Sequence, residues 1–290
     1  MAVNVYEIVT NRIIEQLEKG VIPWRKDWRG SAPMNYVSRK PYRGINTLLL
    51  PHGGEYLTFK QCKERGGKVK AKEKSHVIVF YKTLDKEDEE TGEIKSIPYL
   101  KYSNVFHLSQ CDGIESKLEE IEIDPNVKPI DEAQRIFDDY ILRSGVNINH
   151  LEGSDRASYS PTSDTITLPI IGQFETAEGY YGTAFHEVAH STGHKSRLGR
   201  EMDVGASFGS TSYSEEELIA EIAACMIMNS ANIEQKDTFE NSAAYIGAWL
   251  KKLRSDNRMI VTSSSAAQKA ADLVLGVETD ASSAQYRNNK

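Results

Sequence analysis

The sequence has few of the features that mark secreted or membrane-spanning proteins. It contains only three cysteines in 290 residues, and these lie far apart, which excludes a disulfide framework and a closely spaced Cys pair for a metal. No uninterrupted apolar run approaches the roughly 20 residues needed to cross a bilayer. The N-terminus lacks a basic segment followed by an apolar core. We therefore expect a soluble cytoplasmic protein, in a reducing compartment and without a membrane partner.

The net charge of −7 hides an uneven distribution of charge along the chain. Residues 1–110 contain 19 Lys and Arg against 13 Asp and Glu, whereas the remainder contains 16 against 29. The first part also holds 12 of the 25 Phe, Trp and Tyr residues, several of them beside basic residues. Charge alone is equally compatible with a role in solubility, but the aromatic residues favour contact with a polyanion.

Hydrophobic periodicity and turn residues predict an α+β protein of two domains. Residues 1–112 form a small α+β domain, 113–129 an acidic, proline-containing linker, and 130–290 a mainly helical domain with a small sheet. In the first domain we expect a helix around residues 6–17, a short helix capped by Thr58, and strands at 77–81 and 99–106. In the second we expect helices at 131–144, 176–191, 214–229, 238–256 and 266–275, and strands at 157–160 and 165–168.

The strongest chemical motif is His186-Glu187-Val188-Ala189-His190. Residues four apart on a helix project from one face, so both imidazoles can bind one metal ion. Glu187 lies beside them and is the candidate general base. A catalytic zinc site needs one further protein ligand and an open position for water. The motif therefore predicts one Zn²⁺ ion in a metallopeptidase centre, the alternative being a helix with two exposed histidines. Thr165–Leu168 is then a candidate edge strand for an extended peptide substrate, or else an ordinary strand of the sheet.

A later helix offers the acidic ligand. Glu217 and Glu221 share a helix face, and Glu221 is embedded among apolar residues, whereas Glu215 and Glu216 suit a solvated face. From the residues alone, the choice between Glu217 and Glu221 as third ligand stays open. The segment resembles the third-ligand helix of the gluzincin-type metallopeptidases, which implies that Glu217 binds the metal and that Glu221 orients His186.

Aromatic and basic residues alternate in the N-terminal part, as in proteins that bind single-stranded DNA. The candidates share either a ring next to a cation, a place beside Gly44, or a place in a lysine-rich segment. They are Trp24, Arg25, Trp28, Tyr42, Arg43, Asn46, Lys68 and Lys70. The alternatives are core packing for the tryptophans, turn formation for Arg43 and Asn46, and simple solvation for the lysines.

The two halves together resemble the ArdC-type antirestriction proteins of plasmids, phages and integrative elements. The likeness covers nearly the whole chain and includes Gly20–Trp24, Pro41–Asn46, Tyr56–Gln61, His186–His194 and Glu216–Glu221. It implies an N-terminal single-stranded DNA-binding domain, a C-terminal zincin-like metallopeptidase domain, and protection of incoming DNA from host restriction. Two other functions stay open: a DNA-binding protection factor whose zinc is only structural, and a zinc protease that acts on a host protein.

Overall fold

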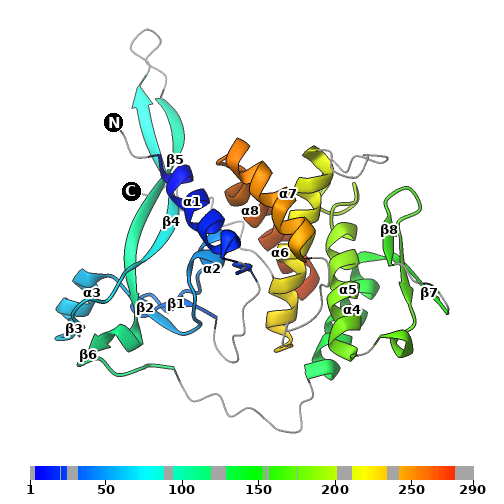
Figure 1. Ribbon diagram of the computed structural model, residues 1–290, viewed down its shortest axis with the longest axis horizontal. Helices are drawn as coiled ribbons and strands as arrows, with labels where there is room; N and C mark the ends of the chain where they lie inside the picture. Colours follow the sequence, from blue (N-terminus) through cyan, green and yellow to red (C-terminus); the bar gives the residue numbers. More distant parts are fainter. Residues whose placement is uncertain are drawn as a thin grey trace. The chain divides into compact units, whose positions relative to one another are not determined.

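The structure is a computed structural model that describes residues 4–19, 21–24, 32–87, 94–118, 129–152, 154, 157–174, 176–200, 211–233 and 242–277. The chain divides into two compact units (Figure 1). The first comprises Met1–Ile123 and Ala243–Thr262, and the second comprises Asp124–Ser242 and Ser263–Lys290. The segment Ala243–Thr262, which the sequence-based division placed in the second domain, thus belongs to the first unit.

The elements confirm a mixed α+β protein. The first unit contains α1 (Val5–Glu18), β1 (Met34–Asn35), α2 (Ile45–Leu49), β2 (Glu55–Leu57), α3 (Phe59–Glu64), β3 (Lys68–Val69), β4 (His76–Glu87), β5 (Ile94–His107), the 3-10 helix η1 (Leu108–Gln110), β6 (Cys111–Asp112) and nearly all of α7 (Ser242–Ser255). The second contains α4 (Pro129–Ser144), β7 (Asn147–Leu151), β8 (Ser158–Ser160), β9 (Thr165–Pro169), the 3-10 helix η2 (Ile171–Gln173), α5 (Ala177–Ser191), α6 (Thr211–Ser230) and most of α8 (Met259–Leu275).

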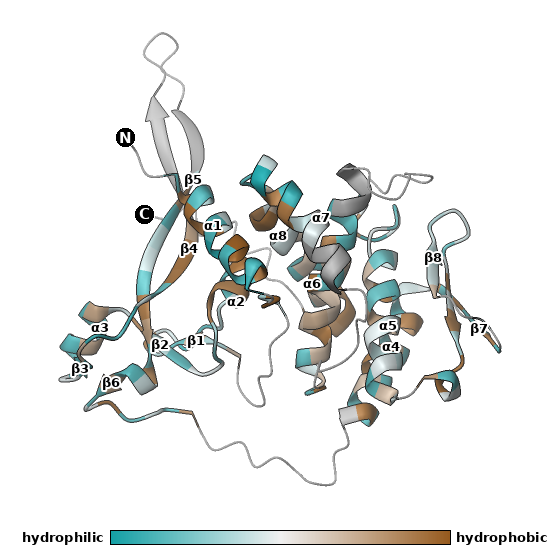
Figure 2. Cartoon of the chain, viewed as in Figure 1, coloured by the Kyte–Doolittle hydropathy of each residue, from teal (hydrophilic) through white to brown (hydrophobic). Residues whose placement is uncertain are grey.

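Local sequence signals explain the helices of the first unit. Asn4 caps α1 by accepting a hydrogen bond from the backbone N–H of Tyr6, and the apolar stripe of α1 is buried. Thr58 and Gln61 form a reciprocal capping box at the start of α3, as the sequence predicts. The sheet has the order β1-β2-β5-β4, and β4 and β5 form a long antiparallel ribbon (Figure 1). In Figure 2 the first half of β4 is hydrophobic, whereas the paired part of β5 is more hydrophilic.

The second unit packs its sheet against the helix that bears the histidine motif. Helix α5 contacts α4, α6, β8 and β9, and its buried residues Tyr181, Phe185 and Val188 belong to the core. The sheet order is β7-β9-β8, with β9 parallel to β7 and antiparallel to β8. Because β9 is the central strand, the expectation that Thr165–Leu168 forms an edge for a peptide is wrong, and β7 and β8 are the edges.

Other features differ from the sequence-based expectation. Strand β7 and helix α2 were not predicted, and α8 begins at Met259 instead of residue 266. The predicted linker starts at residue 113, but the hydroxyl of Ser116 and the backbone N–H of Lys117 both donate to Glu55 Oε2 in the first unit. These bonds fix the start of that segment on the first unit because Glu55 is a buried carboxylate that needs donors.

Among the described residues, no helix is long and apolar enough to cross a membrane.

Candidate metal centre

Helix α5 brings His186 and His190 together. Its N-cap, Thr176, accepts a hydrogen bond from the N–H of Gly179, so the helix begins more than two turns before His186. The two imidazole rings lie edge to face with their centroids 4.7 Å apart. Their Nε2 atoms lie only 3.1 Å apart, which means that both nitrogens point toward one location.

Glu217 of α6 completes a three-donor cluster. Its Oε2 lies 3.4 Å from Nε2 of His186, and its Oε1 lies 3.5 Å from Nε2 of His190. A tetrahedral ion with ligand bonds of roughly 2.0–2.1 Å requires ligand atoms about 3.3 Å apart, so the three observed separations fit such an ion. These residues form the one group of potential metal ligands found among the described residues. The structure thus brings Glu217 into the cluster, whereas Glu221 lies one turn further along α6.

The two other acids predicted for the site, Glu187 of the motif and Glu221 of α6, are buried close by. Glu187 is 8% exposed and Glu221 is 4% exposed. Burial alone would lower the pKa of His186, but its hydrogen bond with Glu217 and the negative charges of Glu187 and Glu221 raise it. Nδ1 of His186 is buried and makes no hydrogen bond with any described residue. The predicted support of His186 by Glu221 therefore stays a prediction, with proximity and charge in its favour.

Glu216 is not part of a solvated face, contrary to the expectation from sequence. Its Oε1 lies 3.3 Å from Nδ1 of His190. Arg200 donates from Nε to Oε2 at 3.0 Å and from Nη2 to Oε1 at 2.7 Å, and it also donates to Thr192 Oγ1 and to the carbonyl of Ala189. Because Nδ1 of His190 faces a carboxylate, the proton of the neutral ring resides on Nδ1 and Nε2 is left to bind a metal. We refer to Glu216 and Arg200 as the His190 clamp.

The His190 clamp was not predicted because no sequence pattern indicates that Glu216 and Arg200 contact each other or His190. Adjacent residues on a helix differ by about 100° in direction, so Glu216 and Glu217 can both lie on the side of the site while they face different atoms. The nearest available signal was Arg200 in the loop after the histidine helix. Nothing in the sequence, however, links that arginine to an acid sixteen positions later.

The cluster has perturbed acid–base properties. Burial alone would lower the pKa of His190, but the carboxylates of Glu216 and Glu217 outweigh it and raise that pKa to about 10. Burial alone would raise the pKa of Glu217, but hydrogen bonds with His186 and His190 outweigh it, so the pKa of Glu217 lies well below its usual value. Glu217 is therefore ionised at neutral pH, and a cation that binds here competes with protons for His190.

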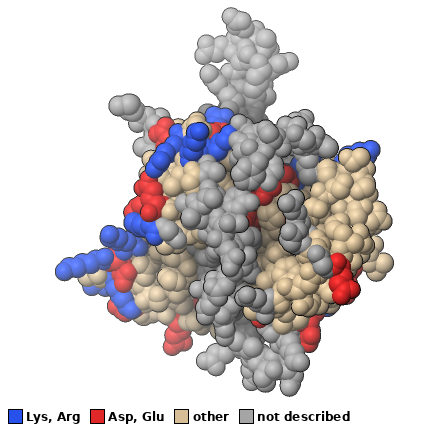
Figure 3. All heavy atoms as spheres, turned by 45° about the vertical axis from the view of Figure 1, so that its right-hand side comes forward, with Lys and Arg blue, Asp and Glu red and all other residues tan. Residues whose placement is uncertain are grey.

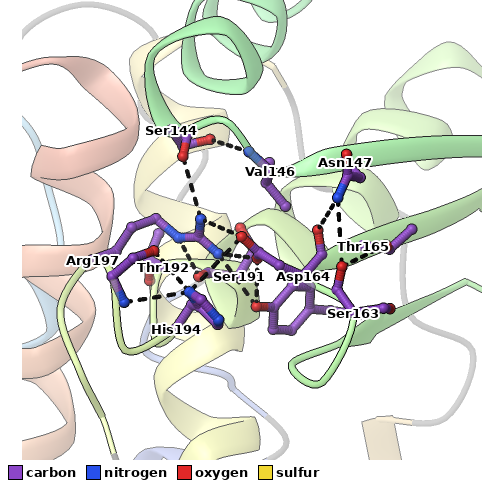
Figure 4. A network of polar contacts seen from close by, with 12 residues as sticks. Ser144, Val146, Asn147, Ser163, Asp164, Thr165, Ser191, Thr192, His194 and Arg197 are labelled. Atoms are coloured by element: carbon purple, nitrogen blue, oxygen red, sulfur yellow. Dashed lines mark hydrogen bonds and ion pairs between the residues drawn. The ribbon is translucent and has the colours of Figure 1, made fainter.

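A second polar network fixes the loop that follows α5 (Figure 4). The buried guanidinium of Arg197 binds both carboxylate oxygens of Asp164, the hydroxyl of Tyr159 and the carbonyl of Ser191. His194 joins this network, with Nδ1 3.8 Å from Oδ2 of Asp164 and 2.7 Å from the hydroxyl of Ser196. The network ties the segment after α5 to the turn between β8 and β9. It therefore supports the chain immediately before Arg200.

The predicted DNA-binding residues have mixed placements. Trp24 is only 3% exposed and packs edge-on against Trp249, with ring centroids 5.0 Å apart. Its ring is part of the core, so the expectation that Trp24 offers a face to a base is wrong. Arg25 and Trp28 lie outside the described residues. Asn46 donates to the carbonyl of Val79 and accepts from its N–H, so its amide already holds α2 on β4.

Tyr42 and the basic candidates are more accessible, but several have partners within the protein. Tyr42 is half-buried against Tyr56, and burial raises the pKa of its hydroxyl. Arg43 and Lys68 are exposed. Lys70 donates to the carbonyl of Ser109. On the face drawn in Figure 3, Lys and Arg gather toward one side, with acidic side chains among them.

Comparisons with known proteins agree with this geometry. Residues 3–106 match the N-terminal domain of the anti-restriction factor ArdC, and residues 135–268 match the zincin-like metallopeptidases. The crystal structure of metal-free ArdC from plasmid R388 is 37% identical, with a TM-score of 0.75 and coverage of 94% of this chain and 97% of that chain. A Mn(II)-bound structure of the same protein is 35% identical, with a TM-score of 0.74 and coverage of 94% and 98%.

Two curated relatives extend the comparison. The uncharacterized protein y4eC of Sinorhizobium fredii is 33% identical over 98% of this chain and 95% of its own length. The DNA primase TraC of Escherichia coli is 36% identical over 94% of this chain. This chain spans only 27% of the length of that primase.

Fold and site together define the class: a two-part protein with an ArdC-type N-terminal domain and a metal-binding, zincin-like metallopeptidase domain. The extensive likeness to the ArdC structure, over nearly all of both chains, makes the assignment specific. The chain belongs to the ArdC family of antirestriction proteins.

Proposed function

We propose that this protein binds single-stranded DNA through its first unit and holds a catalytic zinc ion in its second, and that it thereby protects incoming DNA from host restriction. The observation that supports the catalytic part is the convergence of three donor atoms at separations that fit one tetrahedral ion. Two imidazoles and one carboxylate are a donor set typical of catalytic zinc. The Mn(II)-bound ArdC structure supports a divalent ion at a site of this fold.

The residues of the chain divide the work of peptide hydrolysis. His186, His190 and Glu217 would hold the ion, which would supply Lewis-acid chemistry toward a carbonyl group and toward water. Glu187, buried beside both histidines, would accept the proton of the attacking water and return it to the leaving amine. The His190 clamp would keep His190 in the tautomer that offers Nε2.

Substitution of Glu187 by Gln tests this division. The variant keeps all three metal donors, so elemental analysis of the purified protein should find about one zinc per chain, as in the wild type. It loses the proton acceptor, so cleavage of an unstructured protein such as casein should fall by roughly 10²–10⁴-fold. Cleavage that persists in Glu187→Gln, or zinc-free wild-type protein, would contradict the catalytic part of the proposal.

The same variant separates the two other candidate functions. If Glu187→Gln protects incoming DNA from a restriction enzyme as well as the wild type does, the metal is structural and DNA binding alone gives protection. If the wild type cleaves a host protein in the absence of DNA, and Glu187→Gln does not, the protein is a protease with a protein substrate. Loss of both cleavage and protection in Glu187→Gln is the result that we expect.

A further inference from the structure

The ribbon of β4 and β5 separates charge between its two faces. In the antiparallel register, Phe80 pairs with Lys101 and Lys82 pairs with Tyr99. Paired residues share a face, and successive residues alternate between faces. We define the lysine face as the face that includes these four positions. Over residues 77–87 and 94–104, it comprises positions 78, 80, 82, 84, 86, 95, 97, 99, 101 and 103.

All four lysines of this part of the ribbon fall on the lysine face. They occupy positions 82, 86, 95 and 101, and this face has no Asp or Glu. The opposite face has Asp85 and Glu87 and no Lys or Arg. The register even pairs Lys86 directly with Lys95. A face whose charged positions are all basic suits contact with a polyanion.

The lysine face also has exposed aromatic rings. Phe80 is 37% exposed and Tyr99 is 38% exposed, and Lys101 between them is exposed too. On the opposite face, Val77, Val79 and Leu100 are buried at 4%, 4% and 8%. The buried valines and leucine anchor the ribbon, so the aromatic residues of the lysine face are not needed for that purpose.

The four central positions alternate between aromatic and lysine. Phe80 faces Lys101 across the ribbon, and Tyr99 faces Lys82. The two rings therefore occupy diagonal positions, roughly 7–8 Å apart at their backbones, each with a lysine position beside it. Single-stranded nucleic acids bind to sheet faces in this manner: bases stack on aromatic rings and cations contact the phosphates.

We propose that the lysine face of the β4–β5 ribbon is the surface that binds single-stranded DNA, with Phe80 and Tyr99 as stacking platforms and Lys101 as a phosphate contact. This inference rests on the proposed DNA-binding function and assigns a surface to it. It assigns base stacking to the accessible rings of Phe80 and Tyr99 instead of to the buried ring of Trp24.

Fluorescence anisotropy of the full chain with a labelled oligo-thymidine strand tests the assignment. Phe80→Ala and Tyr99→Ala should each weaken binding roughly five- to hundredfold, the loss of stacking on one base. Phe80→Tyr and Tyr99→Phe keep a ring and should bind as the wild type does. Tyr102→Ala is the matched control, because Tyr102 is 40% exposed but lies on the opposite face of the same strand.

Salt dependence gives a second readout that a folding defect would not mimic. Lys101→Gln should make the slope of log K against log[salt] shallower by about 0.7, the value for one phosphate contact on a single strand. Circular dichroism and thermal melts should show that Phe80→Ala, Tyr99→Ala and Tyr102→Ala remain folded. An unchanged slope for Lys101→Gln would remove Lys101 from the proposed surface.

The outcomes distinguish this inference from the proposed function. If the wild type binds the strand and Phe80→Ala/Tyr99→Ala binds equally well, the surface is wrong while DNA binding stands. If Tyr102→Ala loses as much affinity as the lysine-face variants, the specific assignment is overturned in the same way. If the double variant changes only the oligomeric state, the face is a contact between copies of the chain. If the wild type does not bind the strand, both proposals fail.

Discussion

The His190 clamp should control metal affinity although neither of its residues is a ligand. Substitution of Glu216 by Gln removes the carboxylate that faces Nδ1 of His190 and that accepts both hydrogen bonds from Arg200. The amide keeps one oxygen acceptor but presents NH₂ on its other side, so one bond from Arg200 is lost and His190 is no longer held in one tautomer. Loss of such a partner typically lowers metal affinity ten- to hundredfold, or by about 1.4–2.8 kcal/mol.

Competition with a chromophoric zinc chelator measures this effect directly. Glu215→Gln is the control, because it makes the same chemical change one residue earlier on α6, outside the three-donor cluster and the His190 clamp. Arg200→Lys tests the other half of the clamp: it keeps the charge but loses the planar fork that holds both oxygens of Glu216. Equal zinc affinities for Glu216→Gln and Glu215→Gln, within twofold, would refute the reasoning.

Two further predictions concern stability. Trp24→Ala removes a buried ring packed on Trp249 and should lower the free energy of unfolding, measured in urea, by about 3–5 kcal/mol. The affinity for DNA should stay unchanged at temperatures well below the melting temperature. Loss of DNA binding without loss of stability would contradict the assignment of Trp24 to the core. Asp164→Asn leaves the buried Arg197 without its charged partner and should cost about 3 kcal/mol at neutral pH. Burial alone would raise the pKa of Asp164, but hydrogen bonds from Arg197 and Tyr159 lower it. The ionised carboxylate contributes its full stability above the pKa of Asp in the unfolded chain, about 3.9. This contribution is lost as the pH falls through the lower pKa of Asp164 in the folded protein. The difference in free energy of unfolding between wild type and Asp164→Asn should therefore be constant from about pH 5 to 8 and should shrink below about pH 4. A difference that stays constant down to pH 2 would contradict the ion pair between Asp164 and Arg197.

The parts of the site that depend on one helix could be predicted from the sequence. The convergence of His186 and His190 requires only the period of an α-helix, and the structure places their Nε2 atoms 3.1 Å apart. The choice between Glu217 and Glu221 could not be made in this way, because both lie on one face of α6. One turn, about 5.4 Å along the axis, separates them, and only the packing of α6 against α5 decides which carboxylate reaches the histidines.

Residues with a remote partner were assigned wrongly for a common reason. Trp24 was expected to bind DNA because its neighbours in sequence are basic, but Trp249 buries it. Glu216 was expected to lie on a solvated acidic face because it does not lie among apolar residues as Glu221 does, but Arg200 and His190 contact it. In both cases the local sequence describes the neighbours along the chain, whereas burial depends on a segment that folds back from elsewhere.

The lysine face shows the same limit in a sheet. Composition indicated correctly that the first part of the chain is basic and aromatic, and periodicity predicted both strands, but neither states which residues share a face. A register shift of one residue would move Tyr99 and Lys101 to the face of Asp85 and Glu87, and the alternation of rings and lysines would disappear. The separation of charge is therefore a property of strand pairing. It follows that the aromatic residues to test for DNA binding are those that the register places beside lysines across the ribbon, and not those that adjoin basic residues along the chain.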